Sequence, residues 1–336
     1  MKGKTLLAMA AAFAASVASA NAAEIELKLS SMFPPGHFIH TLIMNPWAEA
    51  LAKKTDGRVN VTLSAAGSAL GDATRQFDQA RAGVVDLAIG IPGIPRGRHP
   101  RTALVELPFV VPNSGVATCA LMAAVDDLAA DFPGTKVIYL TSTEPSAVHL
   151  NREAKGLEDL KGLRVRTPGP AITSLLEHYG ATPVGLPPTQ IYENAERKVI
   201  DGNVMPWGPV GAFKLYEVFN THLDAKINPV GMYMVMNQAK YDSLPEDIKT
   251  AFEEVNKEWF TAANWGKWWS ETDQTAIDAA KERGNTVIEI DAETRDKWRK
   301  DLAPAIDAYL EKESDMDADE ARRVYARLGE AVAGCE

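Results

Sequence analysis

The sequence predicts an α/β fold with largely parallel sheets, divided into two domains. Short segments of strand character recur along the first two thirds of the chain, and segments with helical spacing separate them. Strands and helices that alternate in this way form sheets covered by helices. The chain of 336 residues is also long enough to bury two hydrophobic cores.

The expected elements follow one another from the N-terminal side. Strands are expected at 25–33, 58–64, 84–90, 136–142 and 163–166, and helices at 42–57, 71–83 and 171–180. Residues 58–64 alternate between apolar and polar side chains, whereas 84–90 are almost continuously apolar, as in a strand buried on both faces. Gly57 and Gly83 end the first two helices.

Helical periodicity dominates the last third of the chain. One continuous helix is expected from Ser243 to Gly284, and at 1.5 Å per residue it would be about 60 Å long. Ser243 and Glu246 have the spacing of a capping box, Pro245 suits the first turn, and Gly284 suits the C-terminal end. A helix of this length either spans both domains or is kinked at Gly266.

The first 22 residues are expected to be a secretory signal peptide. Lys2 and Lys4 precede an apolar run over 6–18, and small residues follow it. The run is too short and too rich in alanine to span a bilayer. Cleavage near Ala22 fits the small-residue pattern best, with Ala20 as the alternative, so the mature protein is expected to be exported.

The net charge of −10 restricts the possible partners. An acidic chain without basic clusters argues against nucleic acid and against anionic lipid. A negatively charged ligand would therefore need local cations to bind it.

Motifs for catalysis or metal binding are largely missing from the sequence. It contains no Gly-x-Ser-x-Gly, Gly-x-Gly-x-x-Gly or P-loop pattern, and His37 and His40 lack a second pair of metal ligands. Neither an enzymatic activity nor a metal or cofactor is expected. Cys119 and Cys335 could pair in an oxidising compartment, or Cys119 could be a free buried thiol.

A short expected strand ends at an arginine. In DLKGLRVRTPG, residues 159–169, a turn leads into the strand and Pro168 stops it. Because strand side chains alternate, Arg164 and Arg166 share one face. Ligands of open α/β sheets bind beyond the carboxyl ends of strands, so Arg166 is a candidate for binding an anion. Plain exposure to solvent is the alternative.

Apolar and aromatic side chains lie close to other expected strand ends. They are Phe33, His37, Ile91, Met205 and Trp207. One arginine among such side chains suggests a carboxylate ligand with an apolar body. Trp207, which stands next to proline and glycine, could equally cover the edge of a core.

Several of these segments together resemble the DctP-type solute-binding proteins of tripartite ATP-independent periplasmic (TRAP) transporters. The resemblance rests on SAAGSALGD, RAGVVDLAIG, ELPFVVPN, DLKGLRVRTPG, GATPVGLPPTQIY, VIDG and MYMVMNQAKYDSLPEDIK, and it covers the mature chain to about residue 310. It implies a two-lobed periplasmic binding protein fold with a hinged cleft and one long helix spanning both lobes. Lobe I would comprise 23–143 and 233–275, and lobe II would comprise 144–232 and 276–336.

The resemblance also implies a function. A periplasmic protein of this kind captures a small organic carboxylate by lobe closure and delivers it to the small and large membrane subunits of the transporter. Arg166 would form the salt bridge with the ligand carboxylate. Arg164 would lie outside the cleft, so the strand would have to twist or bend at Val165.

Departures from the family pattern bear on the ligand. Met205 stands where the family commonly has an asparagine as a second carboxylate donor. Ile91 and Pro188 stand where binders of sugar acids have polar residues, and by a looser match Ser146 replaces an arginine. An aromatic or otherwise apolar monocarboxylate is therefore favoured, or a 2-oxo or 2-hydroxy acid.

Three alternatives stay open. A C4-dicarboxylate would need a second cation, for which Arg96 and Arg98 are the candidates. An exported enzyme using the same cleft would need a base, for which His37 or His149 would have to serve. A sensor would share the closing motion without taking part in transport.

Overall fold

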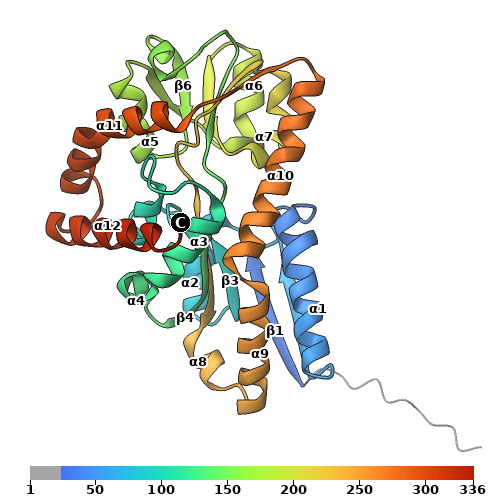
Figure 1. The fold of residues 1–336 in the computed structure, drawn as a ribbon. Coiled ribbons are helices and arrows are strands. Elements are labelled where there is room, and N and C mark those ends of the chain that lie inside the picture. The colour runs from blue at the N-terminus through green and yellow to red at the C-terminus, as the bar shows by residue number, and fades with distance from the viewer. Residues whose placement is uncertain (1–23) are drawn as a thin grey trace, which may run out of the picture.

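A computed structural model describes residues 24–336, which form two lobes with one sheet each (Figure 1). The expected signal peptide and its cleavage near Ala22 lie outside the described residues. We call the lobe with the N-terminal strand lobe I, and the other lobe II. None of the helices in the described part is both long and apolar enough to cross a membrane.

The sheet of lobe I has five strands in the order β2-β1-β3-β10-β4. They are β1 (Ile25–Ser31), β2 (Val59–Ser64), β3 (Leu87–Gly90), β4 (Thr135–Ser142) and β10 (Gly231–Asn237). β1 is parallel to β2 and to β3, whereas β10 is antiparallel to both of its neighbours.

The sheet of lobe II has six strands in the order β11-β9-β5-β8-β6-β7. They are β5 (Ala147–Leu150), β6 (Arg164–Thr167), β7 (Thr182–Gly185), β8 (Gly202–Met205), β9 (Thr221–Asp224) and β11 (Thr286–Glu289). β6 is parallel to β7 and β8, and β9 is parallel to β11, whereas β5 is antiparallel to β8 and β9.

Each sheet has one antiparallel strand, β10 in lobe I and β5 in lobe II, and its other strands all run in the same direction, so the expectation of largely parallel sheets is confirmed. The chain passes from lobe I to lobe II between β4 and β5, and it returns to lobe I between β9 and β10. The antiparallel strands β5 and β10 are thus the first strands after each crossing. These crossings also fix the strand directions. The carboxyl ends of β1, β3, β6 and β8 all point to the boundary between the lobes.

The two connecting segments, 143–146 and 225–230, are hydrogen-bonded to each other where they pass between the lobes. The backbone N–H of Thr143 donates to Val230 (3.0 Å), and that of Ser146 donates to Asn228 (2.7 Å). The N–H of Ile227 donates in turn to Ser146 (2.9 Å). Two hydrogen-bonded connecting segments, rather than a single free tether, therefore form the hinge.

Helices cover both faces of each sheet (Figure 1). In lobe I these are α1 (Asn45–Lys54), α2 (Gln76–Arg81), α3 (Ser114–Ala123), α4 (Val125–Leu128), α8 (Gln238–Asp242) and α9 (Glu246–Trp259). In lobe II they are α5 (Pro170–His178), α6 (Ile191–Glu196) and α7 (Trp207–Ala212). The last three helices are α10 (Ala262–Glu282), α11 (Ala292–Lys312) and α12 (Ala318–Ala333).

The expected long helix is divided in two. α9 ends at Trp259 and α10 starts at Ala262, where the Thr261 hydroxyl accepts a hydrogen bond from the N–H of Asn264. The break therefore lies at 260–261 and not at Gly266, which lies against Gly115 of α3. The expected capping box is also wrong, because α9 begins after Pro245 and the Ser243 hydroxyl donates to Lys240.

α10 alone is the helix that spans both lobes. Trp265 and Trp269 in its first half pack in the core of lobe I, and Ala276 and Ala280 in its second half pack in the core of lobe II. Figure 1 shows this helix running alongside both sheets. The helix of the predicted two-lobed fold is thus present, at half the expected length.

A second helix also joins the lobes. Leu302 of α11 packs in the core of lobe II and Ile306 packs in the core of lobe I, with Pro304 between them. The following helix α12 packs on lobe I, although it was expected in lobe II. The lobe boundaries given above otherwise stay a prediction. Cys119 and Cys335 form a disulfide that joins the end of α12 to α3, which settles the pairing left open above.

Candidate functional site

Arg166 lies near the carboxyl end of β6, close to the boundary between the lobes. Its side chain is only 6% exposed. Nε donates to the carbonyl of Leu186 (3.1 Å) and one terminal nitrogen donates to the carbonyl of Val204 (3.3 Å). Burial lowers the pKa of the guanidinium to about 10, so it keeps its charge at neutral pH.

Within residues 24–336, the Arg166 guanidinium is hydrogen-bonded to backbone carbonyls and to no carboxylate. A buried charge without a counter-ion is unfavourable, because neutral carbonyls replace only part of its hydration. An anionic ligand that binds here would supply the missing charge. The role of Arg166 in binding a carboxylate stays a prediction.

Arg164 is two residues earlier on the same face and has a different environment. It is exposed, and it forms a salt bridge with Asp201 (2.9 Å) and a hydrogen bond with the carbonyl of Lys198 (2.7 Å). The pairing of β6 with β7 is continuous from 164 to 167, so the strand has no bulge at Val165, and the expected twist or bend there stays a prediction. The two arginines differ because they lie at opposite ends of a short strand.

A row of buried polar side chains crosses the lobe II sheet next to Arg166. Arg166 pairs with Asn203 on β8, Asn203 pairs with His149 on β5, and His149 pairs with His222 on β9. Residues paired across strands project to the same face. His149, His222 and Asn203 are fully buried, and both polar atoms of the Asn203 amide lack a partner in the described part of the chain.

The two histidines form a chain of hydrogen bonds. His149 Nε2 lies 3.0 Å from the carbonyl of Met205, so it carries the proton and donates. His149 Nδ1 is then an acceptor for His222 Nδ1–H (2.8 Å), and His222 Nε2 accepts from the Asn285 amide (3.0 Å). Burial lowers the pKa of both rings, which keeps them neutral as this pattern requires.

Met205 and Trp207 follow Asn203 at alternate positions. Met205 is buried, and Trp207 is 1% exposed in the core beneath α6 and α10. The Trp207 ring contacts His149 edge-on, with centroids 4.9 Å apart, and His222 at 4.8 Å. The structure therefore places Trp207 over the histidine pair, as part of a core, and its role as a ligand wall stays a prediction.

Phe33, His37 and Ile91 lie on the lobe I side of the boundary. Phe33 follows β1 and Ile91 follows β3, whose carboxyl ends point to lobe II. The Phe33 and His37 rings stack at 4.6 Å, and all three side chains are partly exposed. The strand directions thus bring these residues to the boundary that Arg166 approaches from lobe II.

The other two predicted residues differ in their surroundings. The Ser146 hydroxyl donates to the carbonyl of Asn228 within the hinge (2.8 Å) and is fully buried. Pro188 is exposed, two residues after Leu186, whose carbonyl holds Arg166. Their contact with a ligand stays a prediction.

Two carboxylates lie close to the hinge. Asp273 of α10 accepts a hydrogen bond from the N–H of Gly208 (2.7 Å), and Glu144 accepts one from the N–H of Ser114 at the start of α3 (3.3 Å). Burial, together with the charge of Glu144, raises the pKa of Asp273 to about 8, so this carboxyl is protonated at neutral pH.

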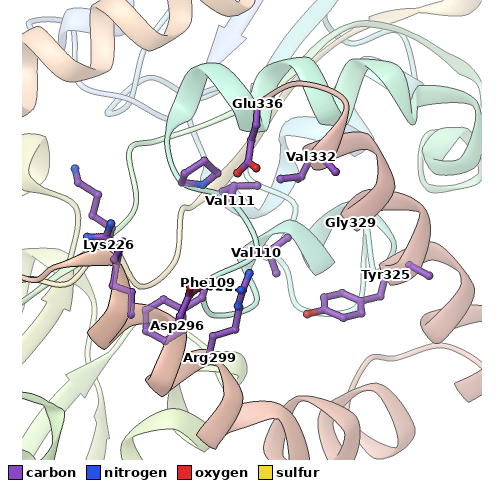
Figure 2. A pocket seen from close by; sticks show the side chains of 15 residues that line it. Phe109, Val110, Val111, Lys226, Asp296, Arg299, Tyr325, Gly329, Val332 and Glu336 are labelled. Carbon is purple, nitrogen blue, oxygen red and sulfur yellow. Dashed lines mark hydrogen bonds and ion pairs between the residues drawn. The ribbon is translucent and has the colours of Figure 1, made fainter.

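Figure 2 shows a cavity of about 460 Å³ outside this region. The loop 109–112, Lys226, the first half of α11 and the end of α12 line it. It contains none of the predicted site residues. α11 covers the face of the lobe II sheet that carries Val165, which is opposite to the face of Arg166. Over the described range, no three His, Cys, Asp or Glu side chains are arranged to hold a metal ion.

Comparison with known proteins identifies the family of the chain. Residues 29–313 match the model of the DctP family, described as "Bacterial extracellular solute-binding protein, family 7". The chain belongs to this family. It is a solute-binding protein of the TRAP type, which confirms the resemblance seen in the sequence, and the family consists of binding proteins rather than enzymes.

Solved structures of DctP-family relatives share the fold. A TRAP solute-binding protein from Rhodoferax ferrireducens T118, in complex with copurified benzoate, is 26% identical with a TM-score of 0.81. The match covers 92% of this chain and 98% of that one. A marine metagenome TRAP protein specific for aromatic acid ligands, bound to metahydroxyphenylacetate, is 26% identical with a TM-score of 0.80. The match covers 93% of this chain and 99% of that one.

A curated relative is the 2,3-diketo-L-gulonate-binding periplasmic protein YiaO of Escherichia coli K12. It is 28% identical over 248 residues, which cover 71% of this chain and 74% of the relative. Relatives within the DctP family thus bind acids of different kinds, and the ligand of this chain has to be argued from its own site.

Sequence reasoning missed Asn203, His222, Asn285 and Asp273. The first of these had a signal, because Asn203 and Met205 alternate along the segment that follows VIDG, so they share a face. The other three could not be found in this way, because their partners are distant in the sequence. Asp273 is 65 residues from Gly208, and His222 is 63 residues from Asn285 and 73 from His149.

Proposed function

We propose that this DctP-family protein binds an organic monocarboxylate with an aromatic or otherwise apolar body by lobe closure and delivers it to the membrane subunits of a TRAP transporter. The observation that carries the proposal is the buried Arg166, whose charge has no acidic partner among the described residues. A guanidinium binds a carboxylate with two parallel hydrogen bonds, and exclusion of water strengthens them. The two carbonyls already fix its orientation.

The side chains around Arg166 support an apolar ligand body. Met205 follows Asn203 on the Arg166 face, and Phe33, His37 and Ile91 approach the boundary from lobe I. The His37 ring is uncharged at neutral pH, because burial and the neighbouring His40 lower its pKa to about 4. These residues offer little to the many hydroxyl groups of a sugar acid.

The two arginines considered as the second cation for a C4-dicarboxylate are both paired with carboxylates. Arg96 lies 3.5 Å from Asp315, and Arg98 is paired with Asp78. Both arginines therefore have acidic partners already. A second carboxylate would have to displace one of these, which argues for a ligand with a single negative charge.

Neither of the two histidines named as a base for the enzyme alternative is well suited to that role. Both ring nitrogens of His149 are engaged, with His222 and with the carbonyl of Met205. His37 Nδ1 accepts a hydrogen bond from the N–H of Ile39 (3.2 Å), and its lowered pKa makes it a weak base. A sensor would bind the same ligands, and transport assays with the membrane subunits distinguish it from a transport protein.

Thermal unfolding against a panel of small carboxylates tests the proposal. A ligand at 100 times its dissociation constant stabilises the native state by about 2.7 kcal/mol, which is easily measured. We expect stabilisation by aryl monocarboxylates and none in Arg166→Ala. Stabilisation of both proteins alike, or by dicarboxylates only, would contradict the proposal.

A further inference from the structure

The Asn203 side chain is the most unusual polar group of the site. It is 0% exposed, and neither its carbonyl oxygen nor its NH2 group has a hydrogen-bond partner within residues 24–336. Buried polar groups are almost always paired, and an amide offers two donors and one acceptor. An asparagine kept here without partners points to a partner that arrives with the ligand.

The neighbours of Asn203 form no hydrogen bond with its amide in the described part of the chain. On one side, His149 uses both ring nitrogens, one with Met205 and one with His222. On the other side, Arg166 donates to the carbonyls of Leu186 and Val204. The strand pairing places Asn203 beside Arg166, and the Arg166 bond to Val204 brings the guanidinium to the residue that follows Asn203.

We propose that Asn203 is a ligand-binding residue that selects a hydroxyl group next to the bound carboxylate, so that the preferred ligands are 2-hydroxy monocarboxylates. This inference rests on the proposed function. Arg166 binds the carboxylate, the Asn203 NH2 donates to a ligand oxygen, and the 2-hydroxyl donates to Asn203 Oδ1. Both polar atoms of the amide are then paired.

Other acids satisfy the amide only in part. The oxygen of a 2-oxo acid accepts a hydrogen bond but cannot donate one, so Oδ1 stays unpaired. An acid without a substituent at this carbon also leaves Oδ1 unpaired. A site built to bind a hydroxyl rejects analogues without it, because its buried polar atoms are left unsatisfied. Met205 is the next residue on this face, and its apolar side chain would contact the body of the acid.

Three acids that differ only at this carbon test the inference: mandelate, phenylglyoxylate and phenylacetate. Their dissociation constants are measured by calorimetry for ligand-free wild-type protein, Asn203→Leu and Asn203→Ala, with thermal unfolding to verify folding. Asn60→Leu serves as the control, since Asn60 is exposed on β2. The alanine variant leaves space in the core and is the substitute if the leucine variant does not fold.

We expect the wild-type protein and the control to bind mandelate at least about tenfold more tightly than the other two acids. In the Asn203 variants this preference should disappear, with phenylacetate affinity changed by less than about threefold. Equal affinities in the wild-type protein would overturn the inference and indicate an amide satisfied by water. An equal loss for all three acids would make Asn203 a support for Arg166 instead.

The outcomes separate this inference from the proposed function. If all three acids bind equally and Arg166→Ala abolishes binding, the carboxylate site stands and the role of Asn203 is wrong. If the wild-type protein binds no carboxylate, both are wrong.

Discussion

Arg166 and Asn203 are paired residues on adjacent parallel strands, and both side chains are buried on the same face of the lobe II sheet. One provides a charge without a counter-ion and the other provides an amide without hydrogen-bond partners in the described chain. Backbone carbonyls fix the Arg166 guanidinium, and His149 lies next to Asn203 in the strand pairing. Under the proposed function, an organic acid that enters at the carboxyl ends of β6 and β8 would meet both groups together.

Replacing Arg166 by lysine should weaken carboxylate binding by about tenfold or more, because a single ammonium cannot make the two parallel hydrogen bonds. Arg164→Lys is the matched control on the same strand, and its affinity should stay close to that of the wild-type protein. Calorimetry with one aryl acid measures both. Equal losses in the two variants would remove the special role of Arg166.

Asp273→Asn should make the unfolding free energy less sensitive to pH. The raised pKa, about 8, means that the folded state keeps a proton that the unfolded state loses near its ordinary pKa of 3.8. The wild-type protein therefore loses stability as pH rises from about 4 to 8, by at most about 1.4 kcal/mol per pH unit for this group. Asparagine does not titrate and keeps the acceptor for Gly208.

Urea unfolding of both proteins at pH 5, 7 and 9 measures this effect. The stability of the variant relative to the wild-type protein should increase from pH 5 to 7 and level off above pH 8. A difference that is independent of pH would show that Asp273 titrates normally.

His222→Leu should destabilise the protein by roughly 1–3 kcal/mol, because it leaves Nδ1 of His149 and one N–H of Asn285 without their partner. His178→Leu is the control, since His178 is exposed at the end of α5. Urea unfolding at pH 7.5 compares the two. If both variants lose the same small amount, the histidine chain contributes nothing.

Removal of the disulfide by Cys119→Ser with Cys335→Ser should lower stability by roughly 2–5 kcal/mol, because a link across 216 residues restricts the unfolded chain. Faster amide hydrogen exchange is expected in α12, which this bond joins to α3. Carboxylate affinity should change little, since neither cysteine is near Arg166 on the sheet. Unchanged exchange in α12 would show that packing alone holds this helix.

Local patterns predicted most of the elements and singled out Arg166 as the candidate cation, whose role in binding stays a prediction. The alternation in 58–64, the stop at Pro168 and the segment before it were enough to find β2, β6 and the candidate Arg166. They were also enough for the α/β class and for the helix that spans both lobes. These features depend on neighbouring residues, which a single sequence displays.

Features that depend on distant contacts were not predictable. Helical periodicity continues through 260–261, yet Phe260 turns into the lobe I core against Tyr139 (4.5 Å) and Thr261 caps a new helix. The histidine pair joins His149 to a residue 73 positions later. The sequence did not decide whether Trp207 faces a ligand or a core. Its contacts with His149 and His222, which are distant in the sequence, show where it packs.

A crystal structure of the mature protein with the aryl monocarboxylate that gives the largest thermal shift tests the central claim most directly. The account predicts the ligand at the boundary between the lobes, with both carboxylate oxygens within hydrogen-bond distance of the Arg166 guanidinium. A ligand that binds elsewhere, with Arg166 still bonded only to the carbonyls of Leu186 and Val204, would contradict it.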